Sequence, residues 1–143
     1  AEDFLIFHPS GSLGKGLLYR VSDLMRSDNL PIVNENEQFI TTLETVDSHK
    51  LGLALIVNDN NTLTGILTDG DIRRTLLKHK DVEHLLVKDV MTKSPKTVEK
   101  SSYAAGALHT MEKYSITALP ILDENSKPIG ILHIHDLLKA GVA

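Results

Sequence analysis

Apolar and polar residues alternate along the chain in a short pattern that first appears in residues 30–78. Residues 30–33 are expected to be extended, and a helix should follow, with one apolar face formed by Phe39, Ile40, Leu43 and Val46. Two apolar runs, 53–57 and 63–67, flank the polar stretch 58–61, which predicts two strands joined by a turn. A second helix is predicted from Asp69 to about Lys78. This half of the chain therefore reads β-α-β-β-α.

The same pattern returns in the second half of the chain. Residues 96–99 are expected to be extended, and Ser101 or Ser102 is a candidate N-cap for the next helix. The apolar face of that helix would comprise Ala104, Ala107, Leu108 and Met111. Strands are predicted at 118–122 and 129–133, and a final helix from Ile134 to about Lys139. The order of elements is again β-α-β-β-α.

Residue identities show that these two halves are copies of one unit. Val21-Ser22-Asp23-Leu24-Met25 recurs as Val87-Lys88-Asp89-Val90-Met91, 66 positions later, and Gly65-Ile66-Leu67 recurs as Gly130-Ile131-Leu132, 65 positions later. A single copy of about 55–60 residues is near the lower limit for a domain that folds alone. We therefore expect an α+β fold in which two repeats pack sheet against sheet about a pseudo-two-fold axis.

Composition narrows the class of protein. The 143 residues are 41% hydrophobic and 24% charged, with a net charge of −4 and no basic block, which argues against nucleic-acid binding. No apolar run approaches the roughly 20 residues that span a membrane. The absence of cysteine excludes disulfides and thiol catalysis and fits a cytoplasmic protein. Neither a glycine-rich phosphate loop nor a nucleophile–base arrangement can be recognised, so we expect no catalysis by this chain alone.

Several of the repeated motifs resemble those of the CBS domain. Because the motifs occur twice in the same order, the chain resembles the tandem pair of CBS domains called a Bateman module. The opening Asp-x-Met occurs at Asp23 and Asp89, and the strand entry 116–121 reads ITALPI. The segment 65–74, GILTDGDIRR, fits the G-x-x-T-x-x-D-x-x-R ending of a CBS repeat. The second ending, 130–139, fits with His133 in place of Thr68 and Lys139 near the arginine position.

A narrower resemblance is to arabinose 5-phosphate isomerases of the KpsF/GutQ group, on the endings 68–74 and 133–142 and on the segment 8–14, HPSGSLG. It implies that residues 1–18 are a linker from an upstream SIS isomerase domain absent from this chain, followed by CBS repeats at 19–80 and 81–143. It further implies that His8 reaches the active site of the intact enzyme, where an aldose–ketose isomerisation needs an acid–base group at the substrate oxygens. In isolation, a histidine before proline in a glycine-rich tail is more often a linker residue.

The CBS resemblance implies a nucleotide in the cleft between repeats, and the residues fit that chemistry. Thr68 would end a strand at a helix N-terminus, where a phosphate is stabilised, and the Asp71 carboxylate can accept two hydrogen bonds from a ribose diol. His133 and Asp136 would repeat these roles. The strand entries 51–54 and 117–120 would supply backbone groups and an apolar wall for a base. The predicted ligand-binding residues are Thr68, Asp71, Arg74, Thr117, Ala118, Pro120, His133 and Asp136.

Alternatives remain beside this hypothesis. Acids in a first helical turn also occur simply because they stabilise the helix dipole. His133 and His135 could share a strand face and chelate a metal, but no third ligand is fixed by spacing, so no metal site is predicted. No cofactor is expected. The resemblance suggests three regulatory ligands: AMP, ATP and CMP-Kdo. CMP-Kdo belongs to the pathway that leads to Kdo and lipopolysaccharide. We expect a homodimer through the CBS pairs and a tetramer in the parent enzyme. The alternative function is a purely structural oligomerisation module with no ligand.

Overall fold

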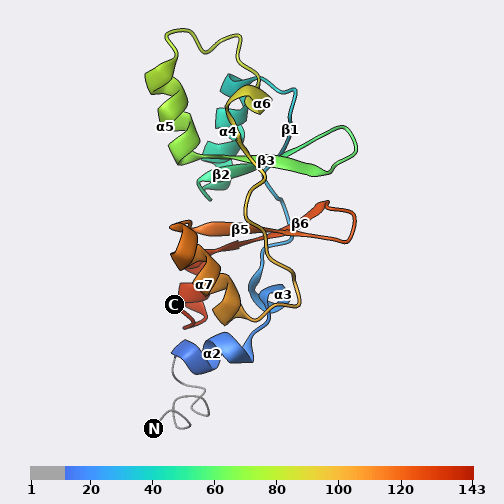
Figure 1. Ribbon diagram of the computed structural model, residues 1–143, viewed down its shortest axis with the longest axis vertical. Helices are drawn as coiled ribbons and strands as arrows, with labels where there is room; N and C mark the ends of the chain where they lie inside the picture. Colours follow the sequence, from blue (N-terminus) through green and yellow to red (C-terminus); the bar gives the residue numbers. More distant parts are fainter. Residues whose placement is uncertain (1–11) are drawn as a thin grey trace. The chain divides into compact units, whose positions relative to one another are not determined.

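The computed structural model describes residues 12–143, and its elements follow the two sequence repeats (Figure 1). After the short helix α2 (Ser12–Leu18), the first repeat comprises α3 (Val21–Leu24), β1 (Ile32–Asn34), α4 (Phe39–His49), β2 (Leu53–Val57), β3 (Leu63–Thr68) and α5 (Asp69–Lys78). The second comprises α6 (Val87–Val90), β4 (Thr92–Lys93), α7 (Ala104–Tyr114), β5 (Ala118–Leu122), β6 (Pro128–His133) and α8 (Ile134–Lys139). The α+β class and the two-fold repetition of elements are confirmed. None of the helices within 12–143 is both long and apolar enough to cross a membrane.

Three details of the structure differ from the sequence-based expectation. Ile40 is 41% exposed, and Thr42 occupies the buried face of α4 in its place. Thr42 can be buried because its hydroxyl donates to the Gln38 carbonyl at 2.9 Å. Neither Ser101 nor Ser102 caps α7: the N-cap is Tyr103, whose side chain makes no capping bond. Residues 96–99 form no strand and contribute only an isolated parallel bridge from Val98 to Ile121.

The compact units of the fold do not coincide with the sequence repeats. Unit 1 contains residues up to 28 together with 96–123 and 129–143, and unit 2 contains 29–95 and 124–128. The Asp-x-Met opening at 23–25 therefore packs in the unit built mainly from the second repeat. The opening at 89–91 packs in the unit built mainly from the first. Each unit thus takes its opening segment from the other repeat.

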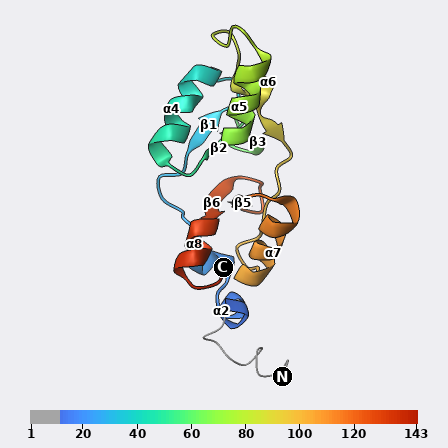
Figure 2. The ribbon, with the colours of Figure 1, turned by 90° about the vertical axis from the view of Figure 1, so that its left-hand side faces the viewer.

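Unit 2 is built on a four-stranded sheet in the order β1-β2-β3-β4. β1 is parallel to β2, and the other neighbours are antiparallel, with Leu53 opposite Thr68 and Ile66 opposite Thr92. α4 and α5 cover one face of the sheet (Figure 2). Every residue of β2 is buried, consistent with its continuous apolar sequence. Its core is formed by Val33, Phe39, Val46, Ala54, Ile56, Leu67 and Val87.

Unit 1 repeats this plan around the two-stranded sheet β5-β6. An antiparallel bridge between Arg26 and Ile131 stands where β4 pairs with β3 in unit 2. α2 packs on α7 at close range, because a Cβ added to Gly16 would lie 2.9 Å from the Ala105 Cβ. The core is formed by Val21, Ala104, Ala107, Met111, Leu119, Ile121, Leu132, Leu137 and Val142.

A glycine in the last strand of each repeat receives the methionine of the opening segment. A Cβ on Gly65 would lie 2.6 Å from the Met91 Sδ, and a Cβ on Gly130 would lie 2.8 Å from the Met25 Sδ. A Cβ on Gly65 would also lie 2.7 Å from the Thr92 carbonyl oxygen, which real Cβ atoms do not approach so closely, so this position needs glycine. At Gly130 the Arg26 carbonyl oxygen lies at 3.0 Å, and the Met25 side chain would have to shift. The repeated glycines and Asp-x-Met openings are therefore two halves of one contact. That contact holds Thr92, which follows Met91, beside the start of α5, and Arg26, which follows Met25, beside the start of α8.

Candidate functional site

The first candidate site is the start of α5, where β3 ends. Thr68 has extended backbone and is the N-cap of α5. Its hydroxyl accepts a hydrogen bond from the Asp71 N–H at 3.2 Å, while the Asp71 Oδ2 accepts from the Thr68 N–H at 2.9 Å. This reciprocal pattern satisfies two backbone donors that the helix itself leaves free. The Thr-x-x-Asp motif thus begins the helix and orients the carboxylate.

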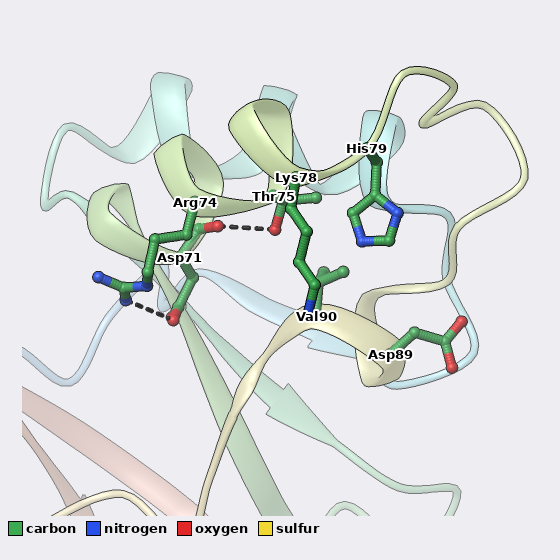
Figure 3. Close-up of a pocket in the computed structure, with 7 residues that line it drawn as sticks. All are labelled: Asp71, Arg74, Thr75, Lys78, His79, Asp89 and Val90. Carbon is green, nitrogen blue, oxygen red and sulfur yellow. Dashed lines mark hydrogen bonds and ion pairs between the residues drawn. The ribbon is translucent and has the colours of Figure 1, made fainter.

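The Asp71 carboxylate is surrounded by donors from three elements. Its side chain is only 6% exposed. The Thr68 hydroxyl donates to Oδ2 at 2.9 Å, and Oδ1 accepts from the Thr92 hydroxyl at 2.8 Å and from Arg74 Nη2 at 3.0 Å. Figure 3 shows the Arg74 contact, together with the bond from the Thr75 hydroxyl to the Asp71 carbonyl. Because the Thr68 hydroxyl donates to Asp71, it is not free to donate to a phosphate in this arrangement.

A hollow of about 260 Å³ extends from Asp71 along α5 toward α6. In Figure 3 the side chains of Lys78 and His79 project from the end of α5 toward α6. The lining residues are Asp71, Arg74, Thr75, Lys78, His79, Asp89 and Val90. Three basic side chains face two carboxylates here, and Asp71 is already satisfied by hydrogen bonds. The hollow therefore carries both signs of charge without a strong net preference.

The second candidate site is the start of α8, at the equivalent place in unit 1. His133 is the N-cap, and its backbone N–H donates to the Asp136 Oδ2 at 3.0 Å. The His133 Nδ1 accepts from the His135 N–H at 3.1 Å, which places the ring proton on Nε2. The two imidazole rings lie with centroids 4.5 Å apart. Unlike Thr68, His133 therefore gives its acidic partner no side-chain hydrogen bond.

Arg26 supplies the missing donors to Asp136. Its Nε lies 3.1 and 3.2 Å from the two carboxylate oxygens, and its Nη2 lies 3.1 Å from Oδ1. The Arg26 side chain is 40% exposed, whereas that of Asp136 is 12% exposed. A mostly buried carboxylate is thus neutralised by a guanidinium that reaches solvent on its outer side.

Burial lowers the pKa of His133 below its ordinary value of 6.5. The neighbouring His135 and Arg26 lower this pKa further, and Asp136 opposes them. The neutral ring also suits the geometry, because only an unprotonated Nδ1 can accept the His135 N–H. The start of α8 is therefore built around a neutral histidine.

The remaining predicted residues lie around these helix starts. Thr117 is exposed, and its carbonyl accepts from the Ile134 N–H at 2.7 Å. The Gly52 carbonyl accepts from the Asp69 N–H at 3.1 Å at the equivalent place in unit 2. Ala118 and Pro120 are buried in β5. Within 12–143, no three residues among His, Cys, Asp and Glu are placed to hold a metal ion. His8 lies outside the described residues.

Sequence reasoning missed Arg26 and Thr92, although each contacts one of the two predicted aspartates. Both residues directly follow the methionine of an Asp-x-Met opening, 66 positions apart. That shared position is a signal in the repeat itself. It could not be connected with Asp136 or Asp71 from sequence, because the contacts span 110 and 21 positions.

Comparison with known proteins agrees with this architecture. The CBS domain family matches residues 21–78 and 87–143, so the chain belongs to the CBS domain family and contains two such domains in tandem. It is 41% identical, over 99% of its length, to proteins named arabinose 5-phosphate isomerase KdsD from Pseudomonas aeruginosa and Escherichia coli. The chain spans 44% and 43% of the lengths of those relatives.

A solved structure is also similar. CBSX2 in complex with AMP superposes with a TM-score of 0.78 at 26% identity, covering 87% of this chain and 97% of that one. The α+β fold is thus that of a tandem CBS pair.

Proposed function

We propose that the chain is the ligand-sensing module of an arabinose 5-phosphate isomerase and that it binds a nucleotide or nucleotide-sugar. The observation that carries this proposal is the buried Asp71 at the start of α5, held between two hydroxyls and an exposed arginine. The naming of the relatives as isomerases and the AMP complex of CBSX2 support it.

The chemistry at Asp71 favours a ribose diol as the part of the ligand that is recognised there. A carboxylate can accept from both hydroxyls of a vicinal diol, and a diol could replace the Arg74 guanidinium as donor. The strand entry at Gly52 and the apolar residues after it would contact the base. AMP, ATP and CMP-Kdo all carry such a diol, and CMP-Kdo would report the output of Kdo and lipopolysaccharide synthesis.

A thermal-denaturation series tests this binding. AMP, ATP and CMP-Kdo are added to the 143-residue chain, and a ligand at 100 times its Kd should stabilise the fold by about 2.7 kcal/mol, which raises Tm by roughly 5–10 °C. Asp71→Asn should remove the shift, whereas Asp59→Asn, in the turn after β2, should retain it. If none of the three ligands shifts Tm, sensing is excluded for these nucleotides.

The parent enzyme would interconvert ribulose 5-phosphate and arabinose 5-phosphate in the cytoplasm, as a tetramer assembled through CBS homodimers. Within it, His8 would act as an acid–base group at the substrate oxygens. His8→Asn in the full-length enzyme should lower kcat by 100-fold or more. Unchanged turnover would indicate that His8 is only a linker residue. The 143-residue chain alone should show no isomerase activity.

A purely structural role is the second candidate, and exposed leucines favour it. Leu76 and Leu77 on α5 are 53% and 82% exposed, and Leu138 on α8 is 52% exposed. Apolar side chains presented to solvent on the closing helices suit an oligomer interface. Leu77→Glu should dissociate a dimer measured by light scattering. A stable dimer that binds none of the three nucleotides would favour this role over sensing.

A further inference from the structure

The two predicted ligand-binding aspartates, Asp71 and Asp136, differ most in one contact. Each is bonded by the residue that directly follows an Asp-x-Met opening, and this residue is threonine in one case and arginine in the other. Thr92 donates one hydroxyl hydrogen bond to Asp71, and Arg26, at the equivalent position of the repeat, contacts both oxygens of Asp136. The backbones of both residues are held in place. Arg26 exchanges two hydrogen bonds with Ile131, at 2.8 and 2.9 Å, and Thr92 pairs with Ile66.

At Asp71, the acceptor positions can be released for a ligand. Arg74 lies on the same helix as Asp71, its side chain is 64% exposed, and it makes one contact with Oδ1. If Arg74 turns into solvent, the carboxylate still accepts from the Thr68 N–H and from the hydroxyls of Thr68 and Thr92, so the guanidinium can leave at small cost. The Thr92 hydroxyl can also rotate and accept a hydrogen bond instead of donating one.

At Asp136, the acceptor positions are occupied by a single group that cannot be released so easily. Arg26 covers Oδ1 and Oδ2, and the His133 N–H takes a further position on Oδ2. Moving Arg26 away would leave a mostly buried carboxylate without its counter-charge, which costs more than losing an exposed pair. A guanidinium has no acceptor to offer a diol.

We propose that Arg26 determines ligand specificity by blocking the Asp136 end, so that only the Asp71 end accepts a diol-bearing nucleotide. This inference rests on the proposed function and adds a definite stoichiometry of one nucleotide per chain. Residue 26 in unit 1 and residue 92 in unit 2 occupy equivalent positions of the repeat. Threonine leaves the aspartate with Arg74 as a guanidinium that a ligand can displace, and arginine covers the aspartate directly.

Exchange of these two residues tests the inference. Isothermal titration of the chain with AMP should give one site per chain. Arg26→Thr should add a second site, with a Kd within about tenfold of the first, and the further change Asp136→Asn should remove it. Thr92→Arg should weaken the original site at least tenfold, which corresponds to one charge-assisted contact to be displaced. Arg73→Thr on the exposed side of α5 is the control for loss of one positive charge and should behave as wild type.

The outcomes separate this inference from the proposed function. Two AMP sites in the wild type, or one site in a folded Arg26→Thr variant, would overturn the role of Arg26 and leave nucleotide sensing intact. Failure of the wild type to bind AMP would count against sensing. In that case binding gained by Arg26→Thr would still support the role of Arg26, and absence of binding in both would reject it. Far-ultraviolet circular dichroism and Tm confirm that each variant is folded.

Discussion

The starts of α5 and α8 each contain a carboxylate that needs hydrogen-bond donors, and the two carboxylates obtain them from different residues. Both hold an aspartate in the first helical turn, and this aspartate is buried at α5 and mostly buried at α8. Asp71 is satisfied by the hydroxyls of Thr68 and Thr92, with Arg74 on the outside. Asp136 faces a histidine that gives it no side-chain donor, and Arg26 provides the charge instead. The difference shows that a repeated sequence motif can preserve a helix start while the aspartate is satisfied by different partners.

Removal of each carboxylate should give the largest difference between the two ends. Asp71→Ala leaves the Thr68 N–H, two hydroxyls and Arg74 without their acceptor, so we expect a loss of about 3 kcal/mol in the free energy of unfolding. Asp136→Ala should cost about 1.5 kcal/mol, because the 40% exposed Arg26 can turn to water. Urea denaturation measures both. Equal losses would show that the hydroxyl hydrogen bonds to Asp71 have no separate effect.

The Thr92 hydroxyl should account for a smaller part of this difference. Thr92→Val keeps the side-chain shape and removes one donor to a buried carboxylate, at an expected cost of about 1 kcal/mol. Thr110→Val is the control, because the Thr110 hydroxyl donates to the Gly106 carbonyl on the exposed side of α7 and its loss should stay within about 0.5 kcal/mol. If the two variants lose the same stability, the Asp71 contact has no special weight.

The Arg26–Asp136 pair should respond to salt. Arg26→Gln removes the charge but retains a donor, and we expect a cost of about 1 kcal/mol at low ionic strength, discounted for the exposure of Arg26. In 1 M NaCl this cost should fall by about half, because salt screens the solvent-facing side of the pair. A cost that does not change with salt would indicate that shape rather than charge matters at this position.

The smallest effect concerns pH and involves only the α8 end. The folded chain lowers the pKa of His133, so as the pH falls below 6.5 the unfolded chain binds this proton before the folded chain does. The contribution of His133 to stability is therefore complete above pH 6.5 and decreases as the pH falls toward the folded-state pKa. His133→Thr, which copies Thr68, should remove this part of the pH dependence.

This prediction is tested by measuring the free energy of unfolding of wild type and His133→Thr in urea at pH 7.5 and pH 5.5. The difference in stability between the two proteins should shift in favour of the variant at the lower pH. Comparison of one variant with wild type cancels the titration of the five histidines other than His133 and its neighbour His135. A difference that is the same at both pH values would contradict a buried, neutral His133.

Local sequence predicted the helix starts well. α5 and α8 begin and end where the Thr-x-x-Asp and His-x-x-Asp segments placed them, and β2 and β5 occupy the predicted residues. These features depend on neighbours within a few residues, through capping bonds and continuous short runs of apolar side chains. The local pattern was less informative for α7, where two candidate serine caps were available and neither is used.

The tertiary structure alone decided how each aspartate is satisfied. The sequence contained the repeat, the family motifs and the two acids, because those are properties of consecutive residues. It could not show that the opening of each repeat packs in the unit of the other, which brings Arg26 to Asp136 and Thr92 to Asp71. Contacts between residues so far apart arise only when the chain folds, since no local rule relates their positions.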